Sequence, residues 1–177
     1  ITIGGTGKTP LVAYIAHVLS KLGYKPGLVS RGYGGKFKET LQVNDETPVK
    51  KTGDEAQILA KLNLPFYIDK NRVRAVKTLA DNHDCDVIIS DDGLQHYSMG
   101  RDIEIVLIDG KRRFGNNLTF PAGPLRESTT RLKDVDFIVN NSGPTQDDEY
   151  LMNISPSKFV HLKTDKSYPV KDWPMHK

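Results

Sequence analysis

Residues 4–9 read GGTGKT, and a helical pattern begins directly after them. A glycine loop of this kind holds phosphates with its backbone N–H groups and its lysine, while the hydroxyl binds Mg²⁺. The usual pattern is G-x-x-x-x-G-K-[ST], but here Thr2 occupies the position of the first glycine. The match is therefore partial, and a glycine turn with a solvated lysine is the alternative. The residues predicted to bind nucleotide are Gly4, Gly5, Thr6, Gly7, Lys8 and Thr9.

A pair of acids, Asp91 and Asp92, follows a predicted buried strand at residues 86–90. A carboxylate at the end of such a strand is what a nucleotide site needs near its Mg²⁺. Ligands of open α/β sheets also bind at that edge. A simple turn, which the following Gly93 would suit, is the alternative. Together with the glycine loop, the acids predict a nucleotide-binding site.

Three further polar clusters each allow two interpretations. Arg31, in SRGYGG, either pairs with a phosphate or belongs to a flexible surface loop. Asp54, in TGDEAQ, lies at a predicted helix start, where capping is the favoured interpretation from the residues alone. Arg126 and Glu127, in PAGPLRE, read as a surface ion pair. The basic run at 111–113 reads as solvated, unless it lies beside a site for anions.

The elements that must position these residues are predicted from hydrophobic periodicity. Helices are predicted over residues 9–22, 53–62 and 71–82. Strands are predicted over residues 26–30, 65–68, 86–90, 103–109, 136–141 and 159–162. The inward faces of the first and third helices are predicted to carry Leu11, Val12, Ile15, Val18, Leu19 and Leu22, and Val73, Val76, Leu79 and Ala80, respectively.

The alternation of strands and helices predicts an α/β fold, P-loop NTPase-like, with a mostly parallel sheet flanked by helices. Residues 110–131 show little periodicity and are rich in Gly, Asn and Pro. A loop of this length within a domain is usually functional or disordered.

The composition is that of an ordinary globular protein. The 177 residues are 37% apolar and 27% charged, which suffices for one domain with a core. The net charge of +3 permits attraction to anionic lipids or phosphorylated substrates, but no nucleic-acid partner is expected. A single cysteine, Cys85, favours a reducing cytosol, and no apolar run reaches the length of a transmembrane helix. Because only three residues precede the glycine loop, we expect the chain to be a fragment.

Five motifs occur in one order, GGTGKTP, SRGYGG, GDEAQ, DDGLQH and FGN…PAGPLRE. This series resembles the tetraacyldisaccharide 4'-kinase family, the lipid A 4'-kinases of Gram-negative bacteria, from residue 1 to about residue 141. Each motif alone is weak, but the ordered series is specific. The resemblance implies that residues 1–177 form a P-loop kinase core. It also implies an N-terminal strand and membrane segment before Ile1 and a C-terminal lobe after Lys177.

The resemblance implies a reaction and a location. ATP, with Mg²⁺, would donate its γ-phosphoryl group to the 4'-hydroxyl of a tetraacylated glucosamine disaccharide 1-phosphate, giving lipid IVA. The enzyme would act peripherally at the cytoplasmic face of the inner membrane. Its partners would be this lipid and the membrane surface.

The resemblance also implies roles for individual residues. The aspartate thought to act on the sugar hydroxyl corresponds to Asp54 in GDEA. The other implied catalytic residues are Lys8, Asp91 and Arg126. The implied metal ligands are Thr9, Asp92 and Glu127. The implied substrate-binding residues are Arg31, Gly32, Tyr33, Gly34 and Arg72, with Arg74 as an alternative to Arg72.

The sequence departs from the family pattern in one respect and from the generic P-loop in another. Thr2 replaces a generic P-loop glycine, which this family's own loop tolerates. Family members have a C-terminal histidine thought to pair with the catalytic aspartate, and DWPMHK at 172–177 does not resemble that motif.

Two other functions fit parts of the sequence. A P-loop switch ATPase or GTPase without a sugar acceptor would explain GGTGKT and the acids, but not RGYGG or PAGPLRE. A regulatory module that binds nucleotide without turnover would follow if the acceptor cleft were missing.

Overall fold

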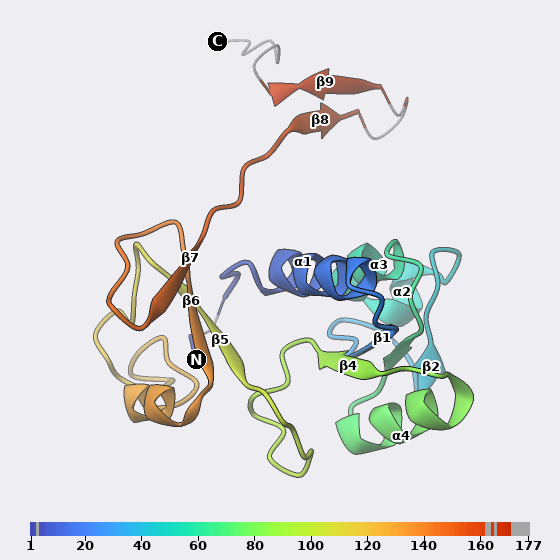
Figure 1. Ribbon diagram of the computed structural model, residues 1–177, viewed down its shortest axis with the longest axis horizontal. Helices are drawn as coiled ribbons and strands as arrows, with labels where there is room; N and C mark the ends of the chain where they lie inside the picture. Colours follow the sequence, from blue (N-terminus) through green and yellow to red (C-terminus); the bar gives the residue numbers. More distant parts are fainter. Residues whose placement is uncertain (3, 162–163, 165, 171–177) are drawn as a thin grey trace.

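The strands that carry most of the predicted site residues form a four-stranded sheet with the order β2-β3-β1-β4. The computed structural model describes residues 1–2, 4–161, 164 and 166–170 (Figure 1). The strands of this sheet are β1 (Pro26–Ser30), β2 (Leu41–Gln42), β3 (Phe66–Ile68) and β4 (Val87–Ser90). The central strand β1 runs parallel to β3 and β4, while the edge strand β2 is antiparallel.

Helices cover both faces of this sheet. Neighbouring residues of each strand point to opposite faces, so a fully apolar strand needs a packing partner on each side. Leu28 of β1 packs in one buried cluster with α1 (Lys8–Lys21) and α3 (Asp54–Ala60). Val29, the next residue, packs in a second cluster with α4 (Arg72–Asn82) on the other side. Figure 1 shows the resulting layers, with α1 and α3 above the sheet and α4 below it.

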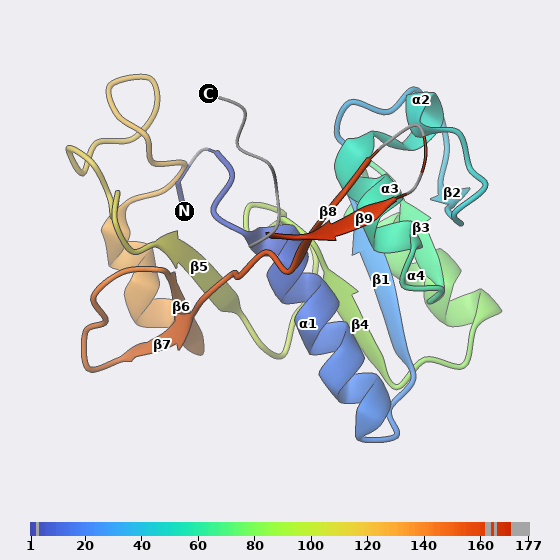
Figure 2. The same cartoon turned by 90° about the horizontal axis from the view of Figure 1, so that it is seen from above.

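A second, fully parallel sheet has the order β5-β6-β7 and lies beside the first (Figure 1). Its strands are β5 (Ile105–Asp109), β6 (Phe137–Asn141) and β7 (Glu149–Met152). A separate buried cluster packs against it, made of Ile1, Val106, Ile108 and Leu125. The chain begins in this cluster and then crosses to the first sheet at α1 (Figure 2). The predicted α/β class and the mostly parallel pairing are confirmed, and strands β1–β7 are divided between these two sheets.

A short antiparallel hairpin, β8 (Lys158–Val160) and β9 (Ser167–Pro169), extends away from both sheets in Figure 1. The prediction of a strand at 159–162 is confirmed for its first half, and residue 162 lies outside the described residues. Residues 172–177, with the DWPMHK segment, also lie outside them. Strands β2, β7 and β9, a four-residue helix α2 (Val49–Thr52) and a 3-10 helix (Thr129–Asp134) were not predicted.

The predicted helices exist, but their inward faces differ in part. Leu22 lies beyond the end of α1 and is 69% exposed. In α4, Val73 and Ala80 are exposed, whereas Arg72, Ala75 and Leu79 are buried. The prediction was wrong there because it excluded charged residues, and the Arg72 guanidinium is accommodated by backbone carbonyl groups.

The 110–131 segment is almost entirely irregular, as predicted, and an isolated bridge joins its Leu125 to Thr2. In the part of the chain that the structure describes, no helix combines the length and apolar character needed to cross a membrane.

Candidate active site

The glycine loop leads directly into α1, whose first turn carries Lys8 and Thr9. Gly7 precedes the helix with a φ of 96°, a left-handed conformation that glycine adopts without strain. No side chain caps this end of the helix, so its first N–H groups remain available to an anion. A Cβ added to Gly5 would meet no atom within 4 Å, which leaves open space beside the loop.

Parallel pairing brings two of the predicted motifs to one edge of the sheet. Val29 of β1 is in register with Ser90 of β4, so the residues that follow both strands lie at the same carboxyl edge. The backbone N–H of Asp91 donates to the carbonyl of Val29 at 2.9 Å. Arg31, which follows β1, therefore lies at the same sheet edge as Asp91 and Asp92, which follow the neighbouring strand β4.

Asp91 is a buried carboxylate that is 3% exposed. Its Oδ1 has no hydrogen-bond partner within the described structure. Burial raises the pKa of Asp91 to about 6, and the negative charges of Asp92 and Glu55 act in the same direction. Lys8 and Arg72 oppose this shift only in part. A buried acid with an unpaired oxygen suits a site that receives a cation.

Asp92 has a different environment from its neighbour. Its Oδ1 lies 3.6 Å from Lys8 Nζ, and Arg126 Nη1 donates to both of its oxygens at 2.9 and 2.8 Å. Burial alone would raise the pKa of Asp92, but the hydrogen bond from Arg126 and the charge of Lys8 lower it below its ordinary value. Asp92 is thus ionised and links the P-loop lysine to Arg126.

The first two residues of the chain explain how Arg126 reaches this position. Thr2 forms an antiparallel bridge with Leu125, and the backbone N–H of Arg126 donates to the carbonyl of Ile1 at 2.6 Å. The PAGPLRE segment is therefore fixed beside the glycine loop. The interpretation of Arg126 and Glu127 as a surface ion pair was wrong, because each bonds to other partners.

Glu127 is held by two donors, the amide of Gln95 and the hydroxyl of Tyr97. These hydrogen bonds lower its pKa although burial opposes them. Gln95 also accepts a hydrogen bond from Arg126 Nη1 at 3.2 Å. Gln95 therefore connects Glu127 to the Arg126–Asp92 pair, which places both predicted acidic metal ligands in one network.

The RGYGG and GDEAQ motifs meet through close backbone approach. A Cβ on Gly53 would lie 2.0 Å from the carbonyl oxygen of Tyr33, and Gly53 has a φ of 84°. A Cβ on Gly35 would lie 2.4 Å from the carbonyl oxygen of Lys51. Only glycine permits this contact, which sets the RGYGG loop against the start of α3.

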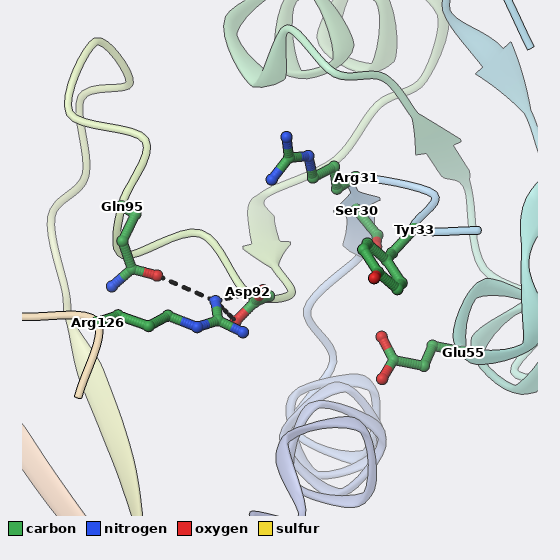
Figure 3. A pocket seen from close by; sticks show the side chains of 7 residues that line it. All are labelled: Ser30, Arg31, Tyr33, Glu55, Asp92, Gln95 and Arg126. Carbon is green, nitrogen blue, oxygen red and sulfur yellow. Dashed lines mark hydrogen bonds and ion pairs between the residues drawn. The ribbon is translucent and has the colours of Figure 1, made fainter. Parts of the chain in front are cut away.

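These segments enclose a cavity of about 290 Å³ (Figure 3). It is lined by Ser30, Arg31, Tyr33, Glu55, Asp92, Gln95 and Arg126. In Figure 3, Glu55 and Tyr33 face the Asp92–Arg126 pair from the opposite side. Arg31 joins Arg126 as a second guanidinium in this lining, and guanidinium groups are suited to bind phosphate.

Asp54 is the first residue of α3 and is exposed, while the next residue, Glu55, lines the cavity. The N-cap position belongs to Gly53, and no side chain caps the helix, so the capping interpretation of Asp54 was wrong. Sequence reasoning missed Ser30, Glu55 and Gln95. All three lie within the quoted motifs SRGYGG, GDEAQ and DDGLQH, which was the available signal.

Arg72 and Arg74 are clearly distinguished. Arg72 is 3% exposed and donates to the carbonyls of Asp69 and Asp91, at 2.8 and 3.4 Å. Burial lowers the pKa of Arg72 to about 10, and the charge of Asp92 opposes this. Arg74 instead pairs with Asp69 at 2.6 Å. Arg72 is thus the arginine beside the acidic pair.

The basic run at 111–113 is solvated in part, since Lys111 and Arg112 are exposed and Arg113 is half-buried. Arg113 pairs with Glu149 at 2.7 Å. A Cβ on Gly4 would lie 3.7 Å from Nη1 of Arg112.

Among the described residues, no group of three or more His, Cys, Asp or Glu side chains could enclose a metal ion. Mg²⁺ does not require such a group, because in phosphate-transfer sites it uses one or two carboxylates together with phosphates and water. A half-buried Thr9 at the start of α1 and the carboxylates of Asp92 and Glu127 fit that pattern.

Comparisons with known proteins agree with this geometry. The chain is 47% identical to the tetraacyldisaccharide 4'-kinase of Shewanella denitrificans, over 96% of the chain and 54% of that protein. It is 51% identical to that of Ruthia magnifica, over 93% of the chain and 52% of that protein. The chain thus spans about half the length of the curated relatives it matches.

The fold also matches a solved structure, the crystal structure of the "apo" form of LpxK from Aquifex aeolicus in complex with ATP. The TM-score is 0.71 at 31% sequence identity, over 79% of this chain and 45% of that one. The sequence model of the tetraacyldisaccharide-1-P 4'-kinase family matches residues 1–175. The chain therefore belongs to the tetraacyldisaccharide-1-P 4'-kinase family.

Proposed function

We propose that the protein carrying this chain transfers the γ-phosphoryl group of ATP to the 4'-hydroxyl of a tetraacylated glucosamine disaccharide 1-phosphate. The product is lipid IVA, an intermediate of lipid A biosynthesis. One observation carries the proposal: Lys8, Asp92 and Arg126, from three separate motifs, are joined at one sheet edge. The cavity at that edge also borders the RGYGG and GDEAQ segments, which a switch ATPase would not explain.

The glycine loop supports the proposed binding of ATP. Three features suit the binding of a nucleoside triphosphate: the uncapped start of α1, the open space at Gly5 and the lysine at position 8. Thr9, Asp92 and Glu127 would hold Mg²⁺, whose chemistry is to neutralise charge on the phosphate oxygens. The buried, unpaired oxygen of Asp91 is consistent with a cation arriving nearby.

The residues across the cavity support the proposed acceptor site. Arg31 and the backbone of Gly32–Gly34 would bind the phosphorylated sugar, with Tyr33 against the ring. Arg72, buried beside Asp91, would stabilise charge that develops during transfer. Asp54 would accept the proton that leaves the 4'-hydroxyl. Glu55, the next residue in the sequence, lines the cavity and is the competing candidate for that role.

A lipid acceptor implies work at a membrane surface, which we place at the cytoplasmic face of the inner membrane. The net charge of +3 favours contact with anionic lipids. Exposed apolar side chains on α1 and α3, Tyr14 and Ile58, are compatible with a peripheral contact.

The proposal is tested by following radiolabelled phosphate from ATP into the acylated disaccharide 1-phosphate in detergent, with protein expressed from its complete gene. We expect labelled lipid from the wild type and almost none from Lys8→Ala. Asp54→Ala should lower turnover roughly 10²–10⁴-fold, the usual contribution of a general base, with ATP affinity nearly unchanged.

Glu55→Gln is the matched comparison, since it neutralises the adjacent carboxylate on the same helix. We expect a smaller loss of turnover, because a residue that only binds the acceptor can be partly replaced by its amide. If the losses are reversed, Glu55 is the base. If ATP is hydrolysed and no lipid is labelled, the kinase proposal is wrong and a switch ATPase replaces it.

A further inference from the structure

A side chain from the second sheet is bonded to the backbone of the glycine loop. Asn141, the last residue of β6, donates from Nδ2 to the carbonyl oxygen of Thr6 at 2.9 Å. The two residues are 135 positions apart in the sequence. The segment before α1 crosses between the two sheets at this point (Figure 1), so the bond ties the loop to β6.

The Asn141 side chain is itself held in a fixed orientation. Its strand lies between two others, with Asn141 in register with Asp109 of β5 and Met152 of β7. Its Oδ1 accepts a hydrogen bond from the Ser142 hydroxyl at 2.9 Å. With the oxygen occupied, the amide nitrogen is the atom directed at Thr6.

Packing around Gly7 reinforces this contact. A Cβ built on Gly7 would lie 2.9 Å from Asn141 Nδ2 and from Ile154 Cδ1, and 3.3 Å from Met152 Cε. The glycine is therefore seated against the end of β6 and the segment that continues from β7.

The bond has a consequence for the N–H group that precedes the P-loop lysine. In a planar trans peptide, the C=O and N–H groups point in opposite directions. Because Asn141 holds the Thr6 carbonyl toward β6, the N–H of Gly7 must point away from it. N–H groups at this position of a glycine loop are the donors that cradle phosphates.

We propose that Asn141 is a positioning residue for the phosphates of the nucleotide. It acts through the Thr6–Gly7 peptide, by fixing the direction of the Gly7 N–H, and does not touch the nucleotide itself. The inference rests on the proposed function, since it requires that the glycine loop binds a nucleoside di- or triphosphate.

The test is the affinity for ADP, measured by calorimetry on the protein from its complete gene, together with the KM for ATP. In Asn141→Ala we expect ADP affinity to fall roughly 3- to 10-fold, the usual effect of one lost hydrogen bond. The KM for ATP should rise by a similar factor, with kcat changed less. Asn141→Asp, which keeps the size and loses the donor, should lower the affinity at least as much.

Asn82→Ala is the control, because Asn82 Nδ2 also donates to a backbone carbonyl, that of Thr78, at the far end of α4. It should leave ADP affinity unchanged. If Asn141→Ala and Asn141→Asp lower only the melting temperature and bind ADP as the wild type does, the side chain is merely structural and the inference is wrong. If the wild type itself binds no ADP, the proposed function fails, and the inference fails with it.

Discussion

The carboxylate of Asp91 is buried, and its pKa of about 6 makes a measurable prediction. An aspartate in an unfolded chain titrates near 3.8. The difference is about two pKa units at about 1.4 kcal/mol each, so the ionised Asp91 costs the folded protein about 3 kcal/mol at neutral pH. Its environment disfavours the charge because it is buried and because Asp92 and Glu55 lie nearby.

The sign follows from proton linkage. Between pH 3.8 and 6 the folded state holds a proton on Asp91 that the unfolded state has lost, so this residue's contribution to stability falls as pH rises. Asp91→Asn removes that titration. The stability of Asp91→Asn relative to the wild type should therefore increase by about 2 kcal/mol between pH 4 and pH 8. Any pH-independent cost of the new amide cancels in this comparison.

Urea unfolding at several pH values, with EDTA and without nucleotide, measures the effect. Asp92→Asn is the matched control: the pKa of Asp92 is lowered by Arg126 and Lys8, so removing its charge should destabilise the protein at neutral pH. A stability difference between Asp91→Asn and wild type that stays constant from pH 4 to pH 8 would refute the reasoning. Adding ATP and Mg²⁺ should stabilise the wild type more than Asp91→Asn.

Two further predictions concern the scaffold of the site. Gly53→Ala should lower stability by more than about 1 kcal/mol in thermal unfolding, because its Cβ would meet the Tyr33 carbonyl oxygen; Gly34→Ala, also at positive φ but with nothing within 4 Å, should cost less. Arg113→Ala should cost about 2 kcal/mol in urea, because it removes the ion-pair partner of the half-buried Glu149 and leaves only its hydrogen bonds from Asn140 and Gln146. Burial raises the pKa of Glu149 but its hydrogen bonds lower it overall, so the contribution of Glu149 should be lost as pH falls below about 4.5.

The fold class and most of the site motifs were predictable because they depend on local patterns. All residues of strand β1 are buried, and the sequence Gly7-Lys8-Thr9 indicates the turn into α1. The edge at which Arg31 and Asp91 meet followed from parallel pairing alone. These features need no knowledge of distant contacts, since strand direction fixes which loops share an edge.

What could not be predicted depends on contacts between distant segments. Arg72 is buried because the carbonyls of Asp69 and Asp91 accept its hydrogen bonds, which no helical pattern reveals. Glu55, and not Asp54, lines the cavity because Gly53 seats the start of α3 against Tyr33. The partition of strands β1–β7 into two sheets likewise depends on pairings that the order of elements leaves open.

The departure at Thr2 from the usual glycine has a structural reason. Position 2 is bridged to Leu125 and is only 5% exposed, so it is a buried pairing residue. That pairing places Arg126 where its guanidinium meets Asp92, the same carboxylate that Lys8 approaches from α1. Position 2 thus pairs with the segment that carries Arg126, and this pairing links the glycine loop to the segment that completes the site.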